Sequence, residues 1–243
     1  MPPRTVIGVD CATVAKAVGL ARARVVNGRW HLLEAEVGAP ARPPATVLTA
    51  WLREDSGALV ALDAPLGWPA ALGPALASHR AGEPIAVPIE AMFQRATDHD
   101  VRRRTGKRPL EVGADRIART AWATLALLTE VRAATGHALP LAWDPEVREA
   151  PAAIEVYPAA TLRAHGLPDR GYKDPNAAPR AVIDAWVRER LDLPADLDLV
   201  GGVGHVLDAV LCVVAGLDFL AGAAPEPADP GTARREGWIW VRG

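Results

Sequence analysis

Two short apolar runs, each ending in an aspartate, constrain the fold of this chain more than any other feature. The first covers residues 5–10 and the second covers residues 58–63. A near-continuous apolar run of this length is typical of a strand that is covered on both faces, as in parallel α/β sheets. Because ligands of such sheets bind beyond the carboxyl ends of the strands, we expect Asp10 and Asp63 to lie at a functional edge.

The rest of the chain alternates between strand and helix patterns. The extended stretches 17–26 and 30–37 are joined by Asn27-Gly28, a pair whose tolerance of positive φ predicts a β-hairpin. This order predicts an α/β fold in which a three-stranded antiparallel meander is joined to parallel strands, with the fourth strand beside the first. Further patterns predict helices over 45–55, 117–134, 159–165, 180–191 and 205–220, and strands over 153–157 and, at the edge, 238–241.

Composition excludes several classes of protein. The chain has 243 residues, of which 50% are hydrophobic and 23% charged, so it is not mainly disordered. Its formal net charge of −2 argues against coating of nucleic acid by the whole surface, so such a contact has to be local. Two cysteines, no secretory signal and no long apolar span predict a soluble protein of the reducing cytoplasm, with no membrane partner.

Four carboxylates are candidates for one metal site. Asp10 and Asp63 end strands that we expect to lie roughly 4.8 Å apart. Asp208 follows a glycine-rich turn near the start of a predicted helix, and Glu155 interrupts an apolar strand. Mg²⁺ prefers oxygen ligands, and bound divalent ions activate water for phosphodiester hydrolysis. We predict Asp10, Asp63 and Asp208 as ligands of Mg²⁺ or Mn²⁺, and these three with Glu155 as catalytic residues.

Each of these acids also has a structural interpretation. Asp10 and Asp63 are able to open a turn after a strand, and Asp208 to complement a helix dipole. Glu155 is able to pair with an arginine beneath the sheet. One shared site, however, accounts for all four positions together.

Six motifs in a fixed order resemble a known family. They are GVDCA at 8–12, LDAPLGWP at 62–69, QRATDHDVRRRTGKRP at 94–109, IEVYPAATL at 154–162, GYK at 171–173 and GHVLDAVLCVVAGL at 204–217, followed by a terminal EGWIWV. From Val6 to Val241 the chain is similar to domain-of-unknown-function family 429, which is catalogued as predicted nucleases with a ribonuclease H-like fold.

The resemblance implies a single ribonuclease H-like domain over residues 1–243, with a mixed five-stranded sheet flanked by helices. It also implies an acidic core of Asp10, Asp63 and Asp208. One departure from the better-known ribonuclease H enzymes concerns the helix over 45–55. Its acids, Glu54 and Asp55, lie at the far end and do not face the predicted site.

Residues 64–150 are less regular, and we interpret them as an inserted, mostly helical cap over one end of the sheet. Residues 99–109 hold five basic side chains against one acid, Asp100. Such a cluster is either a solvated helix end or a grip on phosphates. Arg95 and Asp98 are spaced to pair on one helix face, which is a structural alternative for Arg95. The residues predicted to bind a nucleic-acid substrate are Arg95, Arg102, Arg103, Lys107 and Lys173.

These features predict a metal-dependent nuclease that hydrolyses DNA or RNA with metal-activated water. One alternative is a nucleotide-binding phosphotransferase of the actin and sugar-kinase type, with the glycine turn at 201–204 near an adenosine. That class has an Asp-x-Gly phosphate loop after each acidic strand, whereas here Pro65 removes an amide donor. A catalytically silent binding protein is the third hypothesis.

Overall fold

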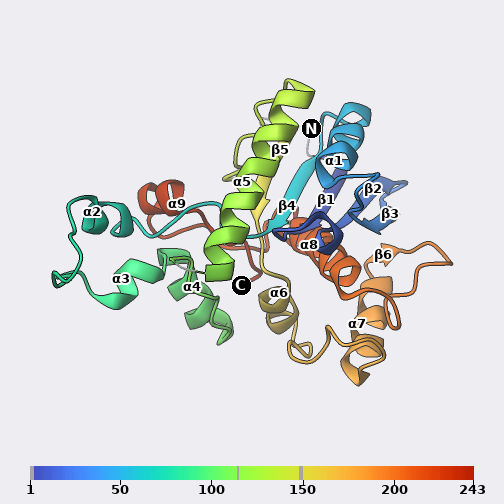
Figure 1. Ribbon diagram of the computed structural model, residues 1–243. Coiled ribbons are helices and arrows are strands. Elements are labelled where there is room, and N and C mark those ends of the chain that lie inside the picture. Colours follow the sequence, from blue (N-terminus) through green and yellow to red (C-terminus); the bar gives the residue numbers. More distant parts are fainter. Residues whose placement is uncertain (1–2, 114, 148–149) are drawn as a thin grey trace.

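A mixed sheet forms the centre of the computed structural model, which describes residues 3–113, 115–147 and 150–243 (Figure 1). In the described residues the strand order is β5-β4-β1-β2-β3-β6, with an antiparallel β1–β2–β3 meander and with β4 and β5 parallel to β1. The predicted α/β fold, and the fourth strand beside the first, are therefore confirmed. The strands are β1 (Thr5–Asp10), β2 (Gly19–Val26), β3 (Arg29–Val37), β4 (Leu59–Asp63), β5 (Ala152–Glu155) and β6 (Leu191–Asp192).

The predicted count of five strands is wrong, because the described sheet has six. The additional strand, β6, has two residues and pairs in parallel with β3. Two residues are too few to leave a periodic signal in a sequence. The hairpin between β2 and β3 turns where predicted, with φ of 51° at Asn27 and 80° at Gly28.

Helices cover both faces of this sheet (Figure 1). Helices α1 and α5 pack on each other and on one face, where Trp51 and Leu128 are fully buried in the same core. Helix α8 covers the other face and contacts β1, β2 and β4. The helices that match predictions are α1 (Pro44–Glu54), α5 (Asp115–Thr135), α6 (Pro158–Ala164), α7 (Ala178–Arg188) and α8 (Gly204–Leu220).

The segment predicted as a cap has two parts. Helix α5 belongs to the layer on the sheet, because Leu128 and Val131 are buried in its core. The helices α2 (Leu72–Ala77) and α3 (Ile89–Phe93) extend away from the sheet, and α4 (Ala96–Thr105) packs against the C-terminal helix α9 (Pro230–Glu236) (Figure 1). Residues 114 and 148–149 of this segment lie outside the described residues.

The C-terminal segment 238–241 lies beside β5 without forming the predicted strand. Ile239 makes one isolated parallel bridge to Glu155, and the Trp240 amide donates to the Glu155 carbonyl over 2.8 Å. The Ile239 amide donates instead to Thr97 Oγ1 of α4 over 2.8 Å. The segment is therefore held by β5 on one side and by α4 on the other.

Two glycines let α8 lie directly on the sheet. A Cβ added at Gly8 of β1 would lie 2.1 Å from the Ala209 carbonyl oxygen. At Gly19 of β2 it would lie 1.9 Å from the His205 carbonyl oxygen. Both neighbours are backbone atoms of α8, so no rotamer change relieves the clash. These glycines therefore set the height of α8, and of Asp208, above the strand ends.

We expect Gly8→Ala to lower the free energy of unfolding by at least about 1–3 kcal/mol, the usual effect of overpacking a core. Urea unfolding of the metal-free protein measures the change. Gly73→Ala on α2 is the matched control, since no atom lies within 4 Å of the added Cβ and alanine favours a helix. Equal stability of the two variants would contradict the close packing of α8.

Candidate metal centre

Three aspartates from separate parts of the chain converge at one edge of the sheet. Asp10 and Asp63 are register partners at the carboxyl ends of the parallel strands β1 and β4. Side chains alternate along a strand, so both point to the α8 face, as Gly8 does. Helix α8 supplies Asp208, and one carboxylate oxygen of each aspartate lies within 4.8 Å of the others. The structure thus brings together the three predicted metal ligands.

Burial makes this cluster electrostatically unfavourable without a cation. Asp10 and Asp208 are buried, and Asp63 is half-buried. Desolvation, followed by the charges of Asp10 and Asp208, raises the pKa of Asp63 well above its ordinary value. Desolvation also raises the pKa of Asp208, although Lys173 opposes the shift. A divalent ion would remove this repulsion.

Three neighbouring side chains orient the aspartates. The Tyr172 hydroxyl donates a hydrogen bond to Asp208 Oδ1 over 2.8 Å, and the Lys173 ammonium forms an ion pair with Asp208 Oδ2. His205 Nδ1 lies 2.6 Å from Asp10 Oδ2, and this hydrogen bond raises the pKa of His205. Sequence reasoning did not assign Tyr172 a role, although the residue belongs to the GYK motif at 171–173.

The donor set fits Mg²⁺ or Mn²⁺. Carboxylate oxygens are the hard ligands that these ions prefer. Asp208 Oδ2 is buried, and its partner is the Lys173 ammonium. A buried anionic oxygen is stabilised by a neighbouring cation. Asp10, Asp63 and Asp208 are the residues that would hold it.

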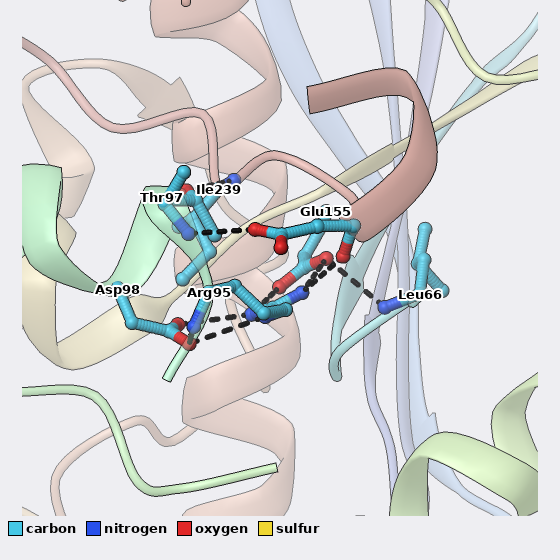
Figure 2. Close-up of polar contacts among 8 residues, drawn as sticks. Leu66, Arg95, Thr97, Asp98, Glu155 and Ile239 are labelled. Atoms are coloured by element: carbon cyan, nitrogen blue, oxygen red, sulfur yellow. Dashed lines mark hydrogen bonds and ion pairs between the residues drawn. The ribbon is translucent and has the colours of Figure 1, made fainter. Parts of the chain in front are cut away.

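Glu155 lies outside this group of ligands. Figure 2 shows the polar contacts of its carboxylate with Arg95 and Leu66. It is the register partner of Leu62, so its side chain points to the opposite face of the sheet from Asp63. Arg95 donates to both of its carboxylate oxygens, over 2.7 and 2.9 Å, and the Leu66 amide donates over 3.0 Å. The structure therefore shows the ion pair with an arginine, and the metal site does not include Glu155.

The predicted phosphate-binding residues occupy different environments. Arg95 is 1% exposed and pairs with Glu155 and Asp98, although it is also among the residues that line the pocket beside the aspartates. Exposed Arg103 pairs with Asp100 over 2.5 Å, and Lys107 pairs with Asp169 over 2.7 Å. Arg102 is exposed on α4. Of these five predicted residues, Lys173 is the one whose charge lies at the aspartates.

A pocket of about 630 Å³ opens beside the aspartates. Its volume lies within the usual range for sites that bind small molecules. Arg95 and Lys107, although both are paired, line it, whereas Arg102 and Arg103 do not. The residues that line it include Asp10, Asp63, Arg116, Ile117, Tyr157 and Lys173.

The strand order and the aspartates at the ends of β1 and β4 and on α8 define an α/β protein with an acidic cluster beyond the carboxyl ends of parallel strands, which is the arrangement that the resemblance implied. This chain belongs to the family described as protein of unknown function DUF429, whose model matches residues 8–232. Thermus thermophilus RuvC, solved in complex with a Holliday junction substrate, is similar over 90% of this chain and 94% of that chain, with 14% identity and a TM-score of 0.40. No curated protein sequence matches significantly. In the described residues, no helix has both the length and the apolarity needed to cross a membrane.

Proposed function

We propose that this protein is a metal-dependent nuclease that hydrolyses phosphodiester bonds of DNA or RNA. One observation carries the proposal, namely the convergence of Asp10, Asp63 and Asp208 oxygens within 4.8 Å at the carboxyl ends of two parallel strands. When bound there, Mg²⁺ or Mn²⁺ supplies an activated water and neutralises charge that develops on the phosphate.

The surrounding side chains have distinct tasks in this proposal. Tyr172 holds the carboxylate of Asp208 in a fixed orientation, which preorganises the ligand set. The Lys173 ammonium, already at the aspartates, stabilises negative charge on a non-bridging phosphate oxygen. His205 Nδ1 is bonded to Asp10, so Nε2 is the atom that takes up or releases a proton. Its side chain is 43% exposed, which gives solvent access to that atom.

No observation favours the phosphotransferase alternative. The glycine turn at 201–204 is closed by the chain itself, since the Gly201 amide donates to Asp198 Oδ1 over 2.8 Å. Arg180 donates to the Gly202 carbonyl over 2.6 Å from a fully buried position. These bonds use backbone groups that a bound nucleotide would otherwise approach.

A cleavage assay tests the proposal. The protein is incubated with single-stranded, duplex and branched DNA and with an RNA–DNA hybrid, in Mg²⁺, in Mn²⁺ and in chelator. We expect the wild type and the Asp192→Asn control to cleave at least one substrate in Mg²⁺ or Mn²⁺, and to cleave none in chelator. Asp192 lies on the edge strand β6, which β2 and β3 separate from β1. Absence of cleavage by the wild type in Mn²⁺ would favour the silent binding protein.

A further inference from the structure

Trp122 is more exposed than the other tryptophans of this chain. The chain has eight tryptophans, all of them in the described residues, and seven are buried or half-buried. Trp122, on α5, is 70% exposed. An indole offers a large flat apolar surface, and leaving one in water is unfavourable unless a partner covers it.

Helix α5 connects Trp122 to the metal centre. Its first turns, with Arg116, Ile117 and Thr120, line the pocket beside the aspartates. Its next turns, from Trp122 to Leu127, line a second groove of about 270 Å³. Cys11, the residue after Asp10, lines both the pocket and the groove. The two depressions therefore share a lining residue at the end of β1, and α5 contributes to the lining of both.

The apolar lining of this groove suits a nucleobase, and exposed arginines on the same helix suit phosphates. Apolar side chains, including Pro43 and Pro44, line it together with Trp122. Arg116, which lines the pocket beside the aspartates, and Arg119 are both exposed on the same helix and precede Trp122 in the sequence. Arg119 precedes Trp122 by three residues, so the two side chains are neighbours on the helix surface. The acid of the groove, Glu130, lies two turns beyond Trp122.

We propose that this groove binds a single-stranded segment of the nucleic acid that leaves the metal centre, with an unpaired base stacked on Trp122. Arg116 and Arg119 hold the phosphates that lead to that base. This inference deepens the proposed nuclease function and rests on it. Bases in a duplex keep their faces covered by their neighbours, whereas an unpaired base offers its face to an aromatic ring. Trp122 is therefore a specificity residue for unpaired DNA or RNA.

Binding measured in an Asp63→Asn background, which removes cleavage, tests the inference. Fluorescence anisotropy is recorded with labelled 12-nucleotide DNA and RNA single strands and with duplexes of the same sequence. Base stacking is worth about 1–3 kcal/mol, so Trp122→Ala is expected to weaken single-strand binding roughly 5- to 150-fold. Trp122→Phe retains a ring and is expected to keep most of the affinity. Duplex binding is expected to stay unchanged.

Val182→Ala is the matched control, because this apolar residue is 50% exposed on α7, a different helix. A second readout is the indole emission, which a stacked base quenches. We expect the single strand to quench the wild type and not Trp122→Phe. Quenching that persists in Trp122→Phe, or equal loss of single-strand and duplex binding in Trp122→Ala, would overturn the inference.

The two proposals fail in different ways. If the wild type cleaves, and Trp122→Ala binds and cleaves single strands equally well, the inference is overturned while the nuclease function stands. If nothing is cleaved but single-strand binding depends on Trp122, the binding groove stands and the nuclease function fails. Melting curves show whether Trp122→Ala is folded, which its exposed position leads us to expect.

Discussion

Asp63→Asn is expected to abolish cleavage and, without metal, to give a protein at least as stable as the wild type. Removal of one metal ligand weakens the stabilisation of the transition state by several kcal/mol, which lowers kcat at least about 100-fold. Stability responds differently, because the carboxylate of Asp63 is repelled by Asp10 and Asp208 and disfavoured by desolvation. A neutral amide of similar size relieves both.

The pH dependence of metal-free stability has a definite sign. The pKa of Asp63 is raised in the folded protein, so the folded state binds more protons than the unfolded state between the two pKa values. Stability from this group is fully present below the ordinary carboxyl pKa of about 3.9 and is lost as the pH rises through the raised value. We expect Asp63→Asn to flatten this decline.

Thermal melting with and without Mn²⁺, at several pH values, checks both statements. Metal is expected to raise the Tm of the wild type and of Asp192→Asn, because it binds the folded state alone, and to leave Asp63→Asn unchanged. A large loss of metal-free stability in Asp63→Asn would show instead that Asp63 serves mainly to open the turn at Pro65.

The sheet and the aspartate cluster were predictable because local patterns specify them. The apolar run of β1 is buried at every position, and the Asn27-Gly28 pair has the positive φ values that its turn requires. Once β4 lies parallel to β1, the register alone places Asp10 beside Asp63. The alternation of side chains then sends both carboxylates to the face that α8 covers.

The same alternation explains why the position of Glu155 was harder to predict. A shift of one residue in a strand exchanges its two faces. Glu155 is paired with Leu62 and not with Asp63, and this register is not readable from the sequence of β5. The environment of Arg95 likewise depends on contacts with Glu155 and Glu236, which are 60 and 141 residues away. Only its pairing with Asp98 is local, and the spacing predicted it.

The Arg95–Glu155 pair is expected to have the largest effect on stability outside the metal centre (Figure 2). Arg95 joins Glu155 of β5 to Asp98 of α4, and it also donates to the Glu236 carbonyl over 3.2 Å. The Glu236 carboxylate in turn accepts the Ala96 amide over 2.8 Å. This network fastens α4 and the C-terminal segment to the edge of the sheet.

Arg95→Met is expected to lower the free energy of unfolding more than Glu155→Gln does. Arg95→Met leaves Glu155 and Asp98 buried without a cation, and the loss of one partner from a buried pair costs about 3–5 kcal/mol. Glu155→Gln leaves Arg95 paired with Asp98, so its cost is expected to be smaller. Burial raises the pKa of Glu155 even with Arg95 in contact, so its charge depends on that arginine.

Urea unfolding in chelator measures these effects without a contribution from metal. Arg103→Met is the matched control, because Arg103 also pairs with an acid three residues away, but its side chain is 72% exposed. Such a pair is worth about 0–1 kcal/mol. An Arg95→Met variant as stable as this control would contradict the fastening role. Glu155→Gln also tests the predicted catalytic role of this acid. If it retains metal-induced stabilisation and kcat at a temperature where it is folded, Glu155 acts only through the packing of β5 against α4.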